Sequence, residues 1–235
     1  MPQKFEIPEA TRARLMTRQG RIHAFEWLDP KRTALLVVDM QNYFMAEGYQ
    51  GYCPHGKSIV PNVNRLADAL REGGGKVIWI LMDASEESKT GWANFHETYK
   101  PENRERRFKT LAEGTEGYKL DPGLVVKPVD ETFIKRRYSA FTEAKGSLID
   151  LLRGQNIETA LVCGVATNVC CESTARTSMM HGVRTIMISD GNATNLDEDH
   201  QHALKNFMTY FGDVQSTDEV VALIAKGVGG RAAAE

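Results

Sequence analysis

The sequence predicts a three-layer α/β/α fold with a mainly parallel central sheet of about six strands. Two observations lead to this fold class: short, continuous apolar runs recur along the 235 residues, and stretches with the apolar spacing of a helix lie between them. Strands that alternate with helices form a parallel sheet, because each helix carries the chain back to the start of the next strand. We expect one domain over residues 31–226, an N-terminal arm over 1–30 and a flexible tail over 227–235.

The expected strands are apolar runs of the kind that helices cover on both faces of a sheet. The first is Thr33-Ala-Leu-Leu-Val-Val-Asp39, which ends in a carboxylate. The others lie at 76–81, 131–135, 159–164 and 184–189. Because ligands of such sheets bind beyond the carboxyl ends of the strands, the residues that follow each strand are the first candidates for a functional site.

The expected helices carry apolar residues at intervals of three and four. They span about 60–70, 148–152, 170–181, 195–211 and a last segment that begins at 216. The last two begin with the spacing of a capping box, Asn195 with Glu198 and Ser216 with Glu219. One long polar segment, 83–130, interrupts the alternation, and loops of this length in a compact domain are usually functional.

The charge balance and the composition exclude several classes of protein. The 29 basic and 31 acidic side chains give a net charge of −2, and no basic cluster is large enough for a nucleic-acid site. No window approaches the roughly 18 apolar residues of a membrane span, and the first twenty residues mix both charges instead of forming an export signal. The four cysteines do not make a disulfide framework in a chain of this length. We therefore expect free thiols, a cytoplasmic location, and no nucleic-acid or membrane partner.

Two charged residues stand where predicted strands end. Asp39 ends the most apolar run, and Lys135 ends the short run at 131–135. Each has a structural alternative, because a strand-end carboxylate often caps a turn and Lys135, followed by two arginines, fits a solvated basic cluster. Taken alone, neither residue decides between a structural and a catalytic role.

A pair of adjacent cysteines follows the predicted strand at 159–164, and we expect Cys170 to open a helix. A thiol at a helix N-terminus feels the positive end of the helix dipole and meets free backbone N–H groups, which lowers its pKa and supplies donors for an oxyanion. Cys163 fits a core residue within the strand, and Cys171 points about 100° away from Cys170 on the helix. Cys170 is therefore the candidate nucleophile, with a buried structural thiol as the alternative.

Three segments of the sequence carry ordered motifs. They are Leu36-Val-Val-Asp-Met-Gln-Asn42, Lys135-Arg-Arg-Tyr-Ser-Ala-Phe141 and Val162-Cys-Gly-Val-Ala-Thr-Asn-Val-Cys-Cys-Glu-Ser-Thr-Ala-Arg176. Together they resemble the motifs of the isochorismatase-like cysteine hydrolases, which include nicotinamidases, N-carbamoylsarcosine amidases and ureidoacrylate amidohydrolases. The resemblance covers about residues 30–225 and is greatest to the ureidoacrylate amidohydrolase branch, which Asn94-Phe-His96 also resembles.

The resemblance implies a catalytic triad of Asp39, Lys135 and Cys170. In such a triad Lys135 favours the thiolate, Asp39 accepts the proton and returns it to the leaving amine, and Cys170 forms a thioester that water cleaves. The family also implies a cis peptide bond before Ala166, with the backbone N–H groups of Ala166 and Cys170 forming an oxyanion hole.

Polar and aromatic residues near these motifs are weaker candidates for substrate binding. They are Tyr43, Trp92, Asn94, His96 and Tyr138. For the aromatic residues a place in the core is the commoner alternative. His96 also fits an ordinary loop histidine.

The histidines and cysteines do not have the spacing of a metal site. Nicotinamidases bind a metal through an Asp-x-His pair, whereas Asp83-Ala-Ser85 lacks the histidine. Cys53-Pro-His55 has no second pair at usable spacing, and His200 and His202 face different directions on a helix. We therefore expect no metal and no cofactor.

These features predict a cofactor-independent cysteine amidohydrolase that cleaves a C–N bond of a small carbamoyl or ureido compound and assembles as a homodimer or homotetramer. Isochorismatases that cleave a vinyl ether commonly lack the nucleophilic cysteine, so Cys170 favours amide chemistry. Nicotinamide or a biuret-like compound stays open as the substrate, as does a non-catalytic binding protein on the same fold. A flavodoxin-like nucleotide binder fits less well, because Gly73-Gly-Gly75 precedes a strand and not a helix.

Overall fold

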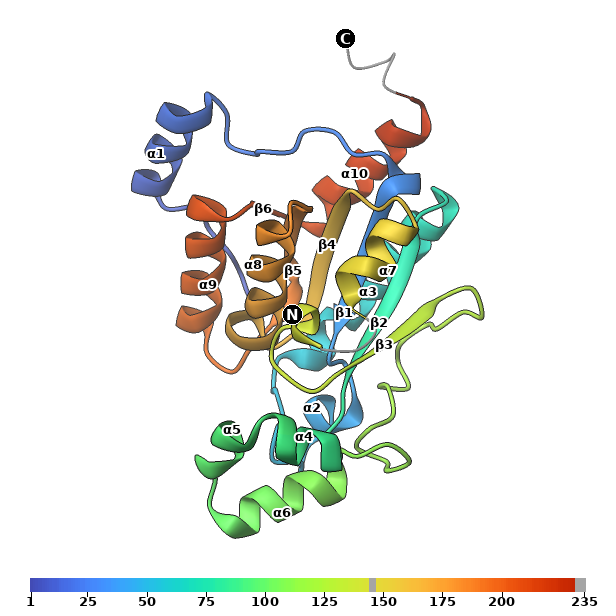
Figure 1. The fold of residues 1–235 in the computed structure, drawn as a ribbon. Helices are drawn as coiled ribbons and strands as arrows, with labels where there is room; N and C mark the ends of the chain where they lie inside the picture. The colour runs from blue at the N-terminus through green and yellow to red at the C-terminus, as the bar shows by residue number, and fades with distance from the viewer. Residues whose placement is uncertain (144–146, 231–235) are drawn as a thin grey trace.

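A six-stranded sheet in the order β3-β2-β1-β4-β5-β6 forms the centre of the computed structural model, which describes residues 1–143 and 147–230 (Figure 1). The strands are β1 Thr33–Val38, β2 Lys76–Met82, β3 Glu131–Lys135, β4 Thr159–Val165, β5 Arg184–Ala193 and β6 Asp213–Gln215. All neighbouring strands pair in parallel. The α/β fold class and the strands expected from the apolar runs are confirmed; β6, with three residues, is too short to give a periodic signal.

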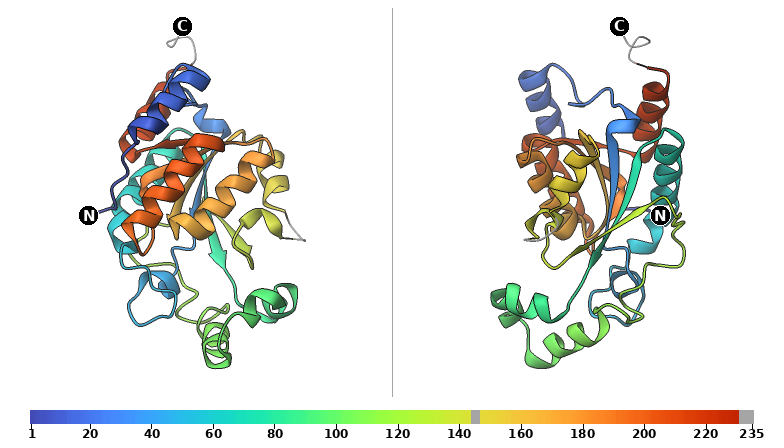
Figure 2. Two further views of the ribbon diagram at one scale, coloured as in Figure 1. Left: turned by 90° about the vertical axis from the view of Figure 1, so that its left-hand side faces the viewer. Right: turned by 45° about the vertical axis from the view of Figure 1, so that its right-hand side comes forward.

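Helices cover both faces of the sheet, as the two views of Figure 2 show. One layer holds α3 (Gly56–Glu72) and α10 (Thr217–Val228), and the other holds α7 (Leu148–Gly154), α8 (Glu172–Met180) and α9 (Asp197–Tyr210). Alternate residues of β1 pack against the two helix layers: Leu35 and Val37 pack against the first layer, and Leu36 and Val38 pack against the second. Since every residue of β1 is therefore buried, its sequence is a continuous apolar run.

The segment between β2 and β3 is less irregular than the sequence suggested. It contains α4 (Glu86–Gly91), α5 (Ala93–Glu97) and α6 (Pro101–Thr110), followed by a long irregular stretch. These three helices lie together beyond the carboxyl ends of the strands, close to the short helix α2 (Asn42–Met45), at the lower end of the view in Figure 1. The segment therefore forms a helical cap over the edge of the sheet where a ligand is expected.

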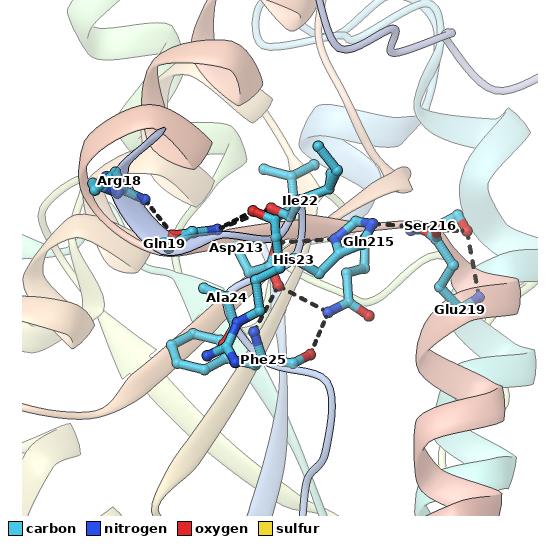
Figure 3. A network of polar contacts seen from close by, with 12 residues as sticks. Arg18, Gln19, Ile22, His23, Ala24, Phe25, Asp213, Gln215, Ser216 and Glu219 are labelled. Carbon is cyan, nitrogen blue, oxygen red and sulfur yellow. Dashed lines mark hydrogen bonds and ion pairs between the residues drawn. The ribbon is translucent and has the colours of Figure 1, made fainter. Parts of the chain in front are cut away.

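Two of the places where the N-terminal arm contacts the domain are its helix and the segment around His23. Its helix α1 (Glu9–Gln19) packs on α9 with Leu15 buried, and the chain then crosses to a 3₁₀ turn at Pro30–Arg32. Figure 3 shows the second place, where the buried Asp213 carboxylate accepts a hydrogen bond from the Phe25 N–H (3.0 Å) and lies 3.1 Å from His23 Nδ1. These contacts tie the arm to β6.

Of the two capping boxes expected from the sequence, one is absent and one is present. Helix α9 begins at Asp197, and its first turn carries no side-chain cap from Asn195, so the capping box expected there is wrong. Three acidic residues in that turn complement the helix dipole instead. The capping box of Ser216 and Glu219 is confirmed, since each side chain accepts the other residue's backbone N–H.

The C-terminal part of the chain and the remaining short elements complete the fold. Helix α10 runs to Val228, so the expected flexible tail is helical over its first two residues, and residues 231–235 lie outside the described part. A second 3₁₀ turn spans Ala140–Thr142, and a π-helical turn spans Thr167–Cys171. Among the residues that the structure describes, no helix is both long enough and apolar enough to cross a membrane.

Candidate active site

Three strand ends bring Asp39, Lys135 and Cys170 to one place. Asp39 follows β1, Lys135 is the last residue of β3, and Cys170 follows β4. Because β2 separates β1 from β3, the long Lys135 side chain must reach past the end of β2, and its Nζ lies 2.8 Å from Asp39 Oδ2. Neither side chain is exposed, so the interpretation of Lys135 as a solvated surface residue is wrong.

The backbone of Asp39 leaves the extended conformation at the point where β1 ends. Its φ is +55°, a value in the left-handed region that few residues except glycine, asparagine and aspartate adopt easily. Its N–H still donates to the Ile80 carbonyl (2.9 Å), which holds the residue at the edge of the sheet. This turn directs the carboxylate toward Lys135.

The chain before Cys170 passes close to β1. Gly164 has a φ of +119°, and a Cβ atom there would lie 2.1 Å from the Val38 carbonyl oxygen, so only glycine fits. The register with β5 shifts at this point, and the Asn192 side chain fills the irregularity by donating to the carbonyls of Val162 (2.9 Å) and Ile188 (2.7 Å). The next peptide bond, Val165–Ala166, is cis, as the resemblance implies.

Cys170 lies inside the first turn after β4 and does not open a helix as expected. A π-helical turn begins at Thr167, and the Ala166 carbonyl accepts from the N–H groups of Val169 (3.1 Å) and Cys171 (3.2 Å). Single π turns occur often at functional sites. Cys171 is fully buried in the core, so Cys170 is the member of the pair that faces the site.

Two polar contacts hold this turn from the α9 side. Thr167 Oγ1 lies 2.9 Å from Nδ1 of the buried His200, and Thr194 Oγ1 donates to Asn168 Oδ1 (2.7 Å). Burial lowers the pKa of His200 to about 4, so the ring is neutral at neutral pH. His200 therefore supports the turn through its contact with Thr167, and it does not share a ligand role with His202.

The electrostatics of Cys170 differ from the expectation. Burial and the Asp39 carboxylate raise the pKa of the thiol to about 12, against the opposing effect of Lys135. Burial by itself lowers the pKa of Lys135, but Asp39 and Cys170 outweigh it and the net shift is upward. The lowered pKa expected for the Cys170 thiol is therefore wrong, because burial and the neighbouring Asp39 side chain both favour the neutral thiol.

Cys170 opens onto a cavity of about 290 Å³, near the lower end of the roughly 300–1,000 Å³ typical of small-ligand pockets. Of the predicted substrate-binding residues, Tyr43 and Tyr138 line it, as do Ala166 and Cys170 of the implied oxyanion hole. Sequence reasoning missed several further lining residues. They include Gln50, Phe95, Tyr99, Arg107 and Asn195. A larger cavity of about 620 Å³ lies between the arm and α10, and neither Asp39, Lys135 nor Cys170 is among the described residues that line it.

The other predicted substrate-binding residues lie away from this cavity wall. The Trp92 ring stacks on Phe95 (3.9 Å between centroids) and meets the Tyr138 ring edge-on, so it supports lining residues from behind. Asn94 is exposed. His96 is buried in the helical cap, where its Nε2 lies 3.1 Å from Ser88 Oγ, and burial lowers its pKa. None of the three is among the described residues that line the Cys170 cavity.

The other cysteines and the histidines of the described residues do not gather at one place. Cys163 is buried in the core, as expected, and Cys53 is one of the residues that line the cavity. Within residues 1–143 and 147–230, no three His, Cys, Asp or Glu side chains are grouped so that they could hold a metal ion.

Comparison with known proteins identifies the family and its fold. The model of the isochorismatase domain matches residues 33–219. The chain is 32% identical over 205 residues to the ureidoacrylate amidohydrolase RutB of Cronobacter turicensis, covering 79% of this chain and 87% of that protein. The uncharacterized isochorismatase family protein YwoC of Bacillus subtilis is 29% identical over 196 residues, covering 82% and 94%.

A solved structure agrees with these relatives. The crystal structure of a cysteine hydrolase from Pseudomonas syringae pv. phaseolicola superposes with a TM-score of 0.77 at 26% identity, covering 88% of this chain and 98% of that one. This chain therefore belongs to the isochorismatase family of hydrolases. The family resemblance inferred from the three motifs is confirmed.

Proposed function

We propose that this chain is a cysteine-dependent amidohydrolase that cleaves a C–N amide bond of a small carbamoyl or ureido compound, as the name ureidoacrylate amidohydrolase says of its relative. The observation that carries the proposal is the buried pair of Lys135 and Asp39 beside the Cys170 thiol, at the wall of a cavity of small-ligand size. Buried charged groups next to a nucleophile are expensive to maintain, and such arrangements concentrate at catalytic sites.

The resting protonation state suits Asp39 as the general base. The Cys170 Sγ attacks the amide carbon while its proton passes to the Asp39 carboxylate, and the carbonyl oxygen becomes an oxyanion. The protonated Asp39 then gives the proton to the leaving nitrogen, the C–N bond breaks, and ammonia departs from a thioester on Cys170. Lys135, 2.8 Å from Asp39, compensates the negative charge that develops on the substrate oxygen while Asp39 holds the proton.

Hydrolysis of the thioester repeats these steps with water. Asp39 takes a proton from the water that attacks the thioester carbon, the C–S bond breaks, and the proton returns to the Cys170 sulfur. For a ureido substrate the product is a carbamate. The backbone N–H groups of Ala166 and Cys170 are the donors we propose for both oxyanions.

The test is ammonia release from a panel of ureido acids, carbamoyl amino acids, biuret and nicotinamide. We expect turnover with the ureido or carbamoyl compounds. Faster ammonia release from biuret or nicotinamide would contradict the proposed substrate class but would still agree with a cysteine-dependent amidohydrolase. No release from any member of the panel would contradict the proposal and favour a non-catalytic binding protein on this fold.

A further inference from the structure

Arg107 is a buried cation in the helical cap. It lies on α6, where its side chain is only 7% exposed, whereas the adjacent Arg106 is exposed and donates to the Gly48 carbonyl. A guanidinium is rarely buried unless an anion accompanies it, because removing the charge from water is costly. The burial of Arg107 therefore calls for a partner.

The described part of the chain supplies no such anion. No carboxylate there lies within 4.0 Å of the Arg107 guanidinium, and its buried Nε donates no hydrogen bond to those residues. The guanidinium carbon lies 5.6 Å from the ring centroid of Tyr43 and 5.7 Å from that of Phe95, and the neutral Tyr43 hydroxyl shares a hydrogen bond with it. These rings orient the guanidinium and do not neutralise it.

Arg107 lines the same cavity as Cys170. Among the described residues on that wall, it is the one with a charged side chain; the others are aromatic, aliphatic, small or neutral polar. The Lys135 charge is balanced by Asp39, and the Cys170 thiol is neutral. The cavity therefore carries one uncompensated positive charge, at Arg107.

We infer that Arg107 binds a carboxylate of the substrate while the amide of the same molecule reaches Cys170. This inference rests on the proposed function and narrows its substrate class to ureido or carbamoyl acids. A planar guanidinium matches a carboxylate with two parallel hydrogen bonds, and a charge-assisted pair of this kind is strong in a site shielded from water. Biuret and nicotinamide carry no anion and would leave Arg107 unpaired.

The test compares two compounds with the same ureido group, 3-ureidopropionate with its carboxylate and propylurea without it. Increasing concentrations of each compound are added before iodoacetamide, and peptide mapping measures how far the compound protects Cys170 from labelling. The proteins compared are the wild type, Arg107→Met and the control Arg106→Met. We expect 3-ureidopropionate to protect the wild type at concentrations at least tenfold lower than propylurea. Arg107→Met should weaken protection by 3-ureidopropionate roughly ten- to hundredfold and leave propylurea unchanged, while Arg106→Met should change neither.

Equal protection by the two compounds, protection by neither, or a preference that survives Arg107→Met would overturn the inference. If Arg107→Met does not fold, the inference is tested by the wild type alone, through the difference in protection between the two compounds. Ammonia release separates this inference from the proposed function. Arg107-dependent protection without any ammonia release contradicts the amidohydrolase, whereas ammonia release with equal KM for both compounds contradicts the anion site alone.

Discussion

Lys135 Nζ lies 2.8 Å from Asp39 Oδ2, and both side chains are completely buried. The two residues come from the ends of β3 and β1, which are not neighbours in the sheet. A pair of charges in this position is held by the fold and not by local sequence, and removal of either partner leaves the other charge buried and uncompensated. The pair therefore links the stability of the sheet edge to the chemistry of Cys170.

Lys135→Met should lower the rate of ammonia release by about a hundredfold or more, because it removes the cation that compensates Asp39. It should also destabilise the fold by about 3–5 kcal/mol, the usual cost of breaking a buried ion pair. Arg136→Met is the control, since Arg136 pairs with Glu87 (2.8 Å) and its side chain is 28% exposed. Steady-state rates and thermal melts measure both effects. Equal, small losses of rate in the two variants would remove Lys135 from the mechanism.

Asp39→Asn should have opposite effects on turnover and on thiol labelling. The carboxylate raises the pKa of Cys170, so its removal should lower that pKa and speed iodoacetamide labelling at neutral pH. Turnover should be almost abolished, because an amide cannot accept the thiol proton. In the wild type, peptide mapping should show Cys170 labelled before the fully buried Cys163 and Cys171. Slower labelling in Asp39→Asn would contradict the effect of Asp39 on the thiol pKa, and substantial turnover in this variant would contradict the assignment of Asp39 as the base.

Activity should survive dialysis against a strong chelator. The Asp83-Ala-Ser85 segment lacks the histidine of the nicotinamidase metal pair, so the mechanism proposed here runs on protein groups alone. The measurement is ammonia release before and after dialysis against EDTA. A loss of activity that zinc or iron restores would show that the chain depends on a metal.

The buried His200 should make stability fall as the pH drops from about 6.5 to about 4. Its pKa in the folded chain is about 4, against an ordinary value of 6.5, so the unfolded chain binds more protons in this window and is favoured there. The accumulated loss is about 3 kcal/mol. His200→Gln should remove this pH dependence, and His202→Gln, an exposed position on the same helix, should keep it. Denaturant unfolding at several pH values measures the slopes, and identical slopes in all three proteins would contradict the prediction.

Much of the fold could be predicted because its signals are local. The fully buried β1 produces a continuous apolar run, and the residues that end β1 and β3 could be recognised as candidates since ligands bind at that edge. β6 could not be predicted, because three residues give no period. The role of Asn195 was misread, since its spacing to Glu198 fits a cap while the residue lines the cavity.

Asp39, Lys135 and Cys170 could be predicted from the sequence, whereas the electrostatics of the site and much of the cavity wall could not. The position of Cys170 after β4 suggested a lowered pKa, but burial and the proximity of Asp39 act in the opposite direction, and both depend on the tertiary fold. Arg107 gave no signal, since it lies among exposed charges on α6 and only the packing of the cap against the sheet edge buries it. Asn94 and His96 belong to a segment that resembles the ureidoacrylate amidohydrolases, yet neither is among the described residues that line the cavity.

The most direct test of the central claim is the rate of ammonia release by Cys170→Ala, compared with Cys171→Ala on the same substrate. If Cys170 forms the thioester, Cys170→Ala should have no measurable turnover at an unchanged melting temperature, because no other side chain replaces the nucleophile. Cys171→Ala should retain a rate within about tenfold of the wild type, since its side chain is buried in the core. Turnover in Cys170→Ala within tenfold of the wild-type rate would contradict the account.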